Sequence, residues 1–492
     1  MAKRIKKILL ITPPFHSGVV ESAGVWMNVG FVYIAGSLRA AGYEPVIYDA
    51  MSMWHGHDDI RKRIDDERPD VVATTAFTAE IVDALKVLKS AKEVDPRIIT
   101  VIGNVHPTFC YEELLSEHHG IVDFIVRREG EETMAELMDC LSAGDDPGKV
   151  RSIVFFGSGG VTATPERPFI QDLDALPMAW DLVDWPLYTY KPMDKSVLAV
   201  VSSSRGCNQQ CSFCSQQLFW KRNWRMRSAE SFVAELEHLK KTYGVNVVMI
   251  ADETPTLSRQ RWERILDLLI ERKPGVKILM ETRVDDILRD EDILGKYKEA
   301  EIDHIYVGVE ATSQAALDAF RKNIKVEESR RALDLINKHD IVSETSFVLG
   351  MPDDTKDSIR NTVELAKFYN PDLAFFLAIA PWPYSEIYPM LKDHIAVRDY
   401  SRYNLVEPVV KPNNMTLEEV TSELGRASRD FYMHKMKNLD RLSEKKREFM
   451  VKVVHIIATS SYLAGAMKGA MPEDMKKMLA ALTGRPDTAA RV

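Results

Sequence analysis

The chain has 492 residues, of which 45% are hydrophobic and 28% charged, and its formal net charge is −9. This composition is typical of a globular protein of two or three domains and excludes a low-complexity chain. The acidic balance argues against a nucleic-acid partner, and no apolar run approaches the ~18 residues that cross a bilayer. With no signal-peptide pattern either, we expect a cytoplasmic protein that binds neither nucleic acid nor membrane.

The first part of the chain alternates short apolar runs with helical patterns, which is typical of a parallel α/β sheet. Strands are predicted over 7–11, 44–49, 71–76, 98–103 and 124–127, and helices over 29–41, 60–66, 80–94, 111–117 and 131–141. We therefore expect a flavodoxin-like (Rossmann-like) domain over 1–145, whose ligands bind at the carboxyl ends of the strands.

Small and polar residues follow these predicted strands and begin the first helix. They are Pro14, Gly30, Thr75, Thr78, Gly103, Asn104, His106, Glu129, Gly130 and Glu131. No single one is specific, because a histidine after a strand is more often a surface residue in a turn than part of a cofactor site. Their shared position at strand ends makes them binding-site candidates as a group.

The segment 146–195 is rich in glycine, proline and aspartate and is predicted to be an irregular linker. From 196 to 395 strands and amphipathic helices alternate again, with strands over 197–202, 245–251, 276–281, 304–309, 342–349 and 373–379. Six βα units predict a partial (βα)6 barrel of the TIM type, with its site at the carboxyl ends of the strands. Residues 396–492 are predicted to form a helical C-terminal domain, with helices over 417–437 and 445–463.

Three cysteines, Cys207, Cys211 and Cys214, fall in a C-x3-C-x2-C pattern just after the first barrel strand. Three thiolates on one short loop can hold three corners of an iron–sulfur cube and leave one iron without a protein ligand. Zinc is disfavoured, because no cysteine follows Cys214 and the nearest downstream histidine is His238. The cysteines Cys110 and Cys140 lie in apolar surroundings and are predicted to pack in the core.

This cysteine pattern, with Phe213 beside the last thiol, resembles the signature of radical S-adenosylmethionine (SAM) enzymes. The resemblance implies a 4Fe–4S cluster on the three cysteines and SAM bound to the open iron. An electron from a donor such as ferredoxin or flavodoxin would then cleave SAM to a 5′-deoxyadenosyl radical, under anaerobic conditions. Further implied SAM contacts are Phe213 to the adenine, Asp252 and Glu253 to the amino group, Arg283 to the carboxylate, and Glu310.

A charged residue just past a strand is usually a solvated cap. Charged residues at several successive strand ends, above a cysteine loop, favour a binding site instead.

The strand-end residues of the first domain, with the segment 27–35, resemble the cobalamin-binding domain that precedes many radical SAM domains. The D-x-H-x-x-G motif, which supplies a histidine to cobalt in cobalamin mutases, is absent, and His106 stands outside it. The resemblance therefore implies cobalamin with its benzimidazole tail displaced into a pocket and no histidine on cobalt.

Together these resemblances imply a C-methyltransferase that moves a methyl group from methylcobalamin to an unactivated sp3 carbon. Residues 212–216, 219–220 and 252–256 also resemble the branch that contains anaerobic magnesium-protoporphyrin IX monomethyl ester cyclase. Methylases of peptides share this branch, including those acting on a glutamine of methyl-coenzyme M reductase. We favour methylation over cyclisation, with a peptidyl glutamine ahead of a tetrapyrrole as substrate. The remaining alternative is a non-enzymatic cobalamin sensor with a structural cluster.

Overall fold

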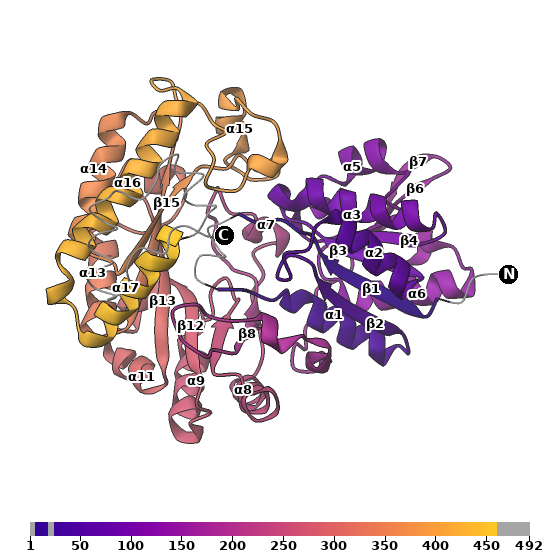
Figure 1. The fold of residues 1–492 in the computed structure, drawn as a ribbon, viewed down its shortest axis with the longest axis horizontal. Helices are drawn as coiled ribbons and strands as arrows, with labels where there is room; N and C mark the ends of the chain where they lie inside the picture. The colour runs from indigo at the N-terminus through magenta and orange to yellow at the C-terminus, as the bar shows by residue number, and fades with distance from the viewer. Residues whose placement is uncertain (1–4, 18–23, 460–492) are drawn as a thin grey trace.

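Two mostly parallel sheets organise the chain in the computed structural model, which describes residues 5–17 and 24–459 (Figure 1). The first sheet begins with the order β2-β1-β3-β4-β5, and these five strands are all parallel. They are β1 (Lys7–Thr12), β2 (Glu44–Asp49), β3 (Val71–Thr75), β4 (Ile99–Gly103) and β5 (Phe124–Val126). This is the strand order of a flavodoxin-like domain, so the predicted fold class is confirmed.

Helices bury both faces of this sheet, which explains why its strands are rich in apolar residues. On one face lie α1 (Val29–Ala40) and α6 (Glu131–Ala143), which contribute buried residues such as Leu38 and Leu137 to one core. On the other face lie α2 (His57–Glu67), α3 (Ile81–Val94) and α5 (Tyr111–His118), which form a second core.

The segment 146–195, expected to be irregular, adds a hairpin to the edge of this sheet. Strands β6 (Ile153–Gly157) and β7 (Gly160–Ala163) pair antiparallel, and β6 pairs antiparallel with β5. The strands are short and separated by a Ser-Gly turn, so the sequence reads locally as a loop. Farther along, the segment packs tightly on α1, where a Cβ on Gly36 would lie 2.2 Å from the Pro177 carbonyl oxygen.

The second sheet has six parallel strands in the order β15-β14-β13-β12-β11-β8. They are β8 (Leu198–Val201), β11 (Val247–Ile250), β12 (Lys277–Arg283), β13 (Ile302–Glu310), β14 (Val342–Leu349) and β15 (Leu373–Ala378). The connecting helices include α8 (Ala229–Tyr243), α9 (Arg259–Arg272), α13 (Val326–Lys338) and α14 (Lys356–Tyr369). The outer strands β8 and β15 do not pair with each other, so the sheet is the predicted partial barrel.

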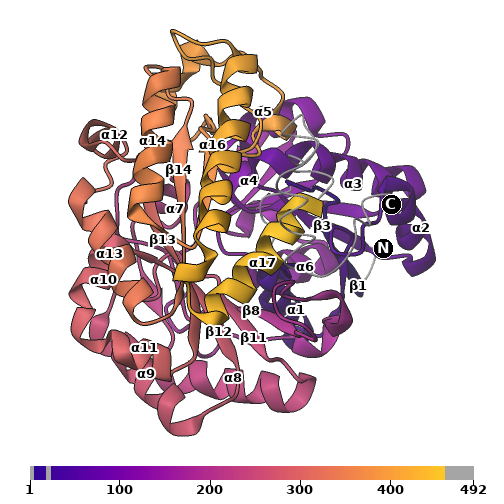
Figure 2. The ribbon, with the colours of Figure 1, turned by 60° about the vertical axis from the view of Figure 1, so that its left-hand side comes forward.

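Two C-terminal helices cover the barrel beside its last strand. Helix α16 (Leu417–Lys437) packs against α14 and β15, and α17 (Glu444–Thr459) follows it (Figure 2). A buried ion pair of 2.6 Å between Lys446 and Asp372 ties α17 to the start of β15. The remainder of the helix predicted over 445–463 lies outside the described residues. Within the described residues, no helix has both the length and the apolar character needed to cross a bilayer.

Candidate active site

The cysteine loop leaves the barrel directly after β8 and the short strand β9 (Ser204–Arg205). Gly206 begins the turn with φ +89°, and a Cβ there would lie 2.0 Å from the Asn223 carbonyl oxygen, so only glycine fits. Two backbone hydrogen bonds then fix the loop, from Cys214 N–H to the Cys211 carbonyl (3.1 Å) and from Ser212 N–H to the Phe320 carbonyl (2.9 Å).

The three thiols line one cavity of about 1200 Å³ at the carboxyl ends of the barrel strands. Burial raises the pKa of Cys214 to about 12, while the N–H groups of Gln216 and Gln217 act in the opposite direction. Among the described residues no other cysteine lines this cavity, so the donor set there is three sulfurs. That set fits a 4Fe–4S cluster with one iron left open to a small molecule.

Four of the residues predicted to contact SAM line the same cavity. They are Phe213, Glu253, Arg283 and Glu310. Arg283 is held in place by a hydrogen bond to Asp285 (2.9 Å), and Glu310 pairs with Lys322 at 2.9 Å, with both of those side chains buried.

Sequence reasoning missed Lys322, Tyr306 and Glu281, which also face this space. Lys322 follows α12 (Gln314–Ala319) and reaches the cavity from a turn, so no strand-end pattern identified it. It has room because Gly308 has no side chain: a Cβ there would lie 2.5 Å from the ammonium nitrogen. Burial and the neighbouring carboxylates of Glu344 and Glu253 raise the pKa of Glu281 to about 7.

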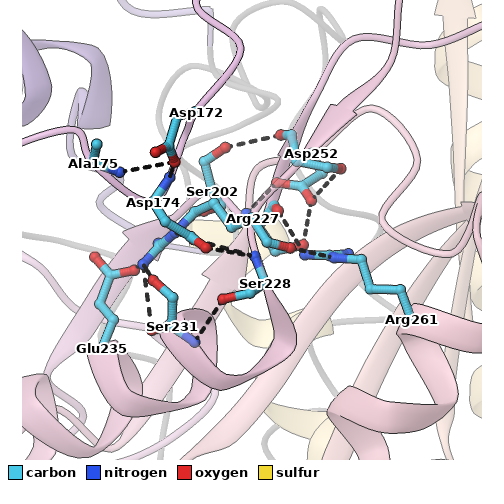
Figure 3. A network of polar contacts seen from close by, with 12 residues as sticks. Asp172, Asp174, Ala175, Ser202, Arg227, Ser228, Ser231, Glu235, Asp252 and Arg261 are labelled. Carbon is cyan, nitrogen blue, oxygen red and sulfur yellow. Dashed lines mark hydrogen bonds and ion pairs between the residues drawn. The ribbon is translucent and has the colours of Figure 1, made fainter.

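Asp252, by contrast, does not line the cavity. Its carboxylate accepts hydrogen bonds from Ser203 N–H (2.7 Å), Ser203 Oγ (2.5 Å) and Ser204 Oγ (2.7 Å). Arg261 donates to the Ser203 carbonyl at 2.6 Å from the other side (Figure 3). Asp252 therefore holds the turn between β8 and the cysteine loop through these donors.

A neighbouring ion pair joins this turn to the linker. Arg227 pairs with the buried Glu235 of α8 and donates to the Ser202 carbonyl at 3.2 Å (Figure 3). Asp174 of the linker accepts from Ser228 N–H at 3.1 Å, at the start of α8. Three segments thus contribute to the polar network under the cysteine loop, which is buried at Asp252, Arg227 and Glu235 and reaches the surface at Asp174.

A second cavity, of about 1100 Å³, lies at the carboxyl ends of β1, β3, β4 and β5 and extends to the barrel. Most of the residues predicted to bind cobalamin line it, namely Gly30, Thr75, Gly103, Asn104, Glu129, Gly130 and Glu131. Asn104 has φ +84° and donates to Thr75 Oγ1 at 2.9 Å, which shapes the strand end. The buried Tyr33 hydroxyl also borders the cavity and has no hydrogen-bond partner among the described residues. The cavity has glycines at its wall, apolar strand residues at its floor and one buried donor without a hydrogen-bond partner among the described residues. This lining fits a large organic cofactor.

The carboxylates of Glu129 and Glu131 are bound by the barrel rather than left open. Arg205 pairs with Glu129 at 2.8 Å and with Glu131 at 2.6 Å, and Arg225 pairs with Glu129 at 2.9 Å. The Arg205 guanidinium also lies 5.0 Å from the centre of the Tyr33 ring. Because Arg205 precedes Cys207 by two residues, this cluster connects the first domain to the cysteine loop.

The third cavity, of about 1650 Å³, lies between the first domain and the barrel and is walled mostly by apolar and aromatic side chains. Its aromatic residues are Phe15, His16, Trp26, Trp54, Phe77, Phe213, Trp382, Tyr384 and Tyr403. It shares Phe213, Cys214, Gln216, Trp382 and Leu405 with the cysteine cavity, whereas Glu253 is shared by the cysteine cavity and the first-domain cavity. The cysteine cavity thus adjoins both others.

Comparison with known proteins identifies the family. Residues 16–138 match the B12 binding domain family and residues 201–366 match the Radical SAM superfamily. An anaerobic magnesium-protoporphyrin IX monomethyl ester cyclase from Rubrivivax gelatinosus is 39% identical over 434 residues, covering 87% of this chain and 78% of that protein. The chain belongs to the cobalamin-dependent radical SAM enzymes. The cofactors of this enzyme class are a 4Fe–4S cluster, SAM and cobalamin.

Two further matches cover most of this radical SAM enzyme. An uncharacterized methyltransferase from Pyrococcus horikoshii is 30% identical, covering 87% of this chain and 93% of that protein. The structure of the radical SAM methyltransferase TsrM from Kitasatospora setae, with cobalamin and a [4Fe–4S] cluster bound, superposes with a TM-score of 0.65 at 16% identity. It covers 87% of this chain and 85% of that one and shares the fold.

Three residues predicted to bind cobalamin lie elsewhere. Helix α4 (Val105–Phe109) turns His106 inward, where its ring packs edge-on to Tyr400, with ring centres 5.0 Å apart, and its Nδ1 lies 3.3 Å from Thr78 Oγ1. Thr78 Oγ1 in turn lies 2.8 Å from the Tyr384 hydroxyl and borders the third cavity. Neither His106 nor Pro14 is among the described residues that line the three cavities. His106 is part of an aromatic contact between the first domain and the C-terminal part of the chain.

Burial lowers the pKa of His106 to about 4, whereas an unfolded histidine titrates near 6.5. The unfolded chain therefore binds the proton more readily, so the stabilisation is complete above pH 6.5 and is lost as pH falls towards 4. We expect this group alone to lower the free energy of unfolding by about 2 kcal/mol between pH 7 and pH 5. Thermal melting of His106→Gln should depend less on pH over that range than thermal melting of wild type. Equal pH slopes for His106→Gln and wild type would contradict this assignment.

Proposed function

We propose that this enzyme is a cobalamin-dependent radical SAM C-methyltransferase acting on an sp3 carbon of a bulky, largely apolar substrate. The observation that carries the proposal is the arrangement of the cavities. The cysteine cavity shares Glu253 with the first-domain cavity and a wall that includes Phe213 and Trp382 with the aromatic cavity. A substrate in the aromatic cavity would lie against the cysteine cavity, which itself adjoins the first-domain cavity, so the three cavities form one connected site for a reaction that uses both cofactors.

In this proposal Cys207, Cys211 and Cys214 hold the cluster. Phe213, Glu253, Arg283 and Glu310 would hold SAM, and Lys322 would add a cation for its carboxylate. The first-domain cavity holds cobalamin through Gly30, Thr75, Gly103, Asn104 and Gly130 together with the Tyr33 hydroxyl. When bound, these groups supply a radical initiator and a methyl donor. The chain's own contribution is to position them and to exclude water from the space between.

The walls of the aromatic cavity favour a substrate with rings or a long hydrocarbon portion. Trp26, Trp54, Trp382 and Tyr403 offer flat apolar surfaces, which bind such groups through burial and stacking. A glutamine side chain of a peptide would place a polar amide against these walls at a cost unless it found a partner. The cavity thus supports an apolar small molecule more strongly than the peptidyl glutamine expected from the sequence.

The test is incubation of the reconstituted, dithionite-reduced enzyme with SAM carrying a deuterated methyl group and with substrates of graded apolar size. We expect 5′-deoxyadenosine, S-adenosylhomocysteine and a product that has gained the labelled methyl group. Formation of 5′-deoxyadenosine without any labelled product or S-adenosylhomocysteine, across the substrates that stimulate it, would refute methyl transfer.

Oxidative ring closure of a tetrapyrrole is the second candidate, because of the 39% identity to a magnesium-protoporphyrin cyclase over most of both chains. The aromatic cavity also suits a flat macrocycle. The same incubation with magnesium-protoporphyrin monomethyl ester separates the two activities. Ring closure gives a product without deuterium that incorporates oxygen from labelled water. Methylation gives a product that carries deuterium and no oxygen from the labelled water.

A further inference from the structure

Three basic side chains, Lys221, Arg222 and Arg321, lie close together outside the cysteine loop, and we call them the basic face. They are 54%, 41% and 57% exposed. Their acidic partners are less exposed, with Glu166 at 28% and Glu386, which pairs with both arginines, at 24%. The basic face thus has three cations against these two less exposed carboxylates, on a chain of formal charge −9.

Short hydrogen-bonded paths connect the basic face to the cysteine loop. Arg222 Nε donates to Gln217 Oε1 at 3.0 Å, and Gln217 Nε2 donates to the Cys211 carbonyl at 3.0 Å. One side chain thus separates Arg222 from a cysteine of the loop. Within the loop, Asn208 and Gln210 are exposed, so the loop itself reaches the surface.

A second path runs through the neighbour of Arg321. The Phe320 carbonyl accepts from Ser212 N–H at 2.9 Å, and the Phe320 ring packs edge-on to Phe213 with ring centres 5.2 Å apart. The basic face therefore borders the cysteine loop from two segments that are distant in sequence. A protein bound here would lie near a cluster held by the three thiols. This proximity would favour electron transfer, because electron tunnelling decays steeply with distance.

We propose that the basic face is the docking surface for an acidic one-electron carrier protein that reduces this enzyme. The inference rests on the proposed function, since it requires a cluster on the cysteine loop. The carrier loses one electron, the group held by the cysteines gains it, and no proton is transferred. Redox complexes commonly have small interfaces, below ~1,200 Å², so a few charges suffice to orient the carrier. Such charges act mainly on the association rate.

The test uses the double variant Lys221→Gln/Arg321→Gln, which leaves the Arg222–Gln217 contact in place. Reduced [2Fe–2S] ferredoxin, an acidic one-electron donor, is titrated against the reconstituted enzyme over a series of salt concentrations. We expect the association rate and the affinity to fall about tenfold at low salt and the salt dependence to become shallower. 5′-Deoxyadenosine formed with dithionite should be unchanged, because that small reductant needs no docking surface.

The matched control is Arg61→Gln/Lys62→Gln, which removes two exposed charges from α2 in the first domain and should bind ferredoxin like wild type. Equal affinity and salt dependence for the basic-face variant and wild type would overturn the proposal. If the double variant also loses dithionite-driven activity, the single variant Lys221→Gln decides, since the ion pair of this exposed side chain is with Glu166. Failure of methyl transfer leaves these binding results intact, so the two proposals are tested separately.

Discussion

Replacing Cys211 with alanine is expected to abolish 5′-deoxyadenosine formation and to remove most of the bound iron. Cys211 is buried, lines the same cavity as Cys207 and Cys214, and its carbonyl anchors both Cys214 and Gln217. Two remaining thiols would leave two irons of a 4Fe–4S cluster without protein ligands, so the cluster would be lost or degraded. Iron and sulfide content, the visible absorption spectrum and 5′-deoxyadenosine yield measure the result.

The control for this experiment is Cys140→Ala. Cys140 lies on α6 in the first domain, away from the cysteine cavity, so iron content and SAM cleavage should match wild type. The comparison also tests the reading of the chain as a cobalamin sensor with a structural cluster. That alternative gains support if wild-type protein with full iron content and bound SAM yields no 5′-deoxyadenosine when reduced.

The fold was largely predictable because its signals are local. Strands such as β11 and β15 are apolar runs bounded by turns, and helices such as α9 and α14 carry apolar residues at helical spacing. The β6–β7 hairpin was not predicted, because its pairing with β5 depends on a contact between distant segments. Its glycine-rich turn is also the local signature of a loop.

The candidate site was predictable where a residue's role follows from its position on a strand end. Arg283 and Glu310 reach the cysteine cavity in that way. Asp252 occupies an equivalent position but is bound by Ser203 and Ser204, and nothing in the sequence shows which donors lie nearest. Lys322 and Trp382 reach the site from turns far along the chain, so only the tertiary structure places them there.

The charged cluster around Glu129 shows how the two cofactor regions are joined. Glu129 is 8% exposed and accepts from Arg205 and Arg225 as well as from Ile170 N–H at 2.8 Å. Its partners come from the barrel and from the linker, so its carboxylate balances charge at a buried junction. Nε and Nη2 of Arg225 have no hydrogen-bond partner among the described residues, whereas its Nη1 bonds to Glu129 and to the Ile170 carbonyl.

Replacing Glu129 with alanine is therefore expected to destabilise the protein by roughly 3–5 kcal/mol, because it leaves two buried guanidinium groups undercompensated. Melting temperature and urea unfolding measure this loss, and Glu132→Ala is the matched control. Glu132 belongs to the same acidic stretch, but its side chain is 54% exposed and its ion pair with Arg167 is 3.3 Å long. Its removal should cost no more than about 1 kcal/mol.

A second measurement separates a local effect from general instability. Arg205 precedes Cys207 by two residues, so breaking its ion pair with Glu129 should loosen the cysteine loop and lower iron content even at temperatures where the rest of the chain stays folded. Glu129→Gln, which keeps hydrogen-bond acceptance but not charge, should fall between wild type and alanine in both measurements. If Glu129→Ala melts like Glu132→Ala and retains full iron, the junction does not couple the first domain to the cluster loop.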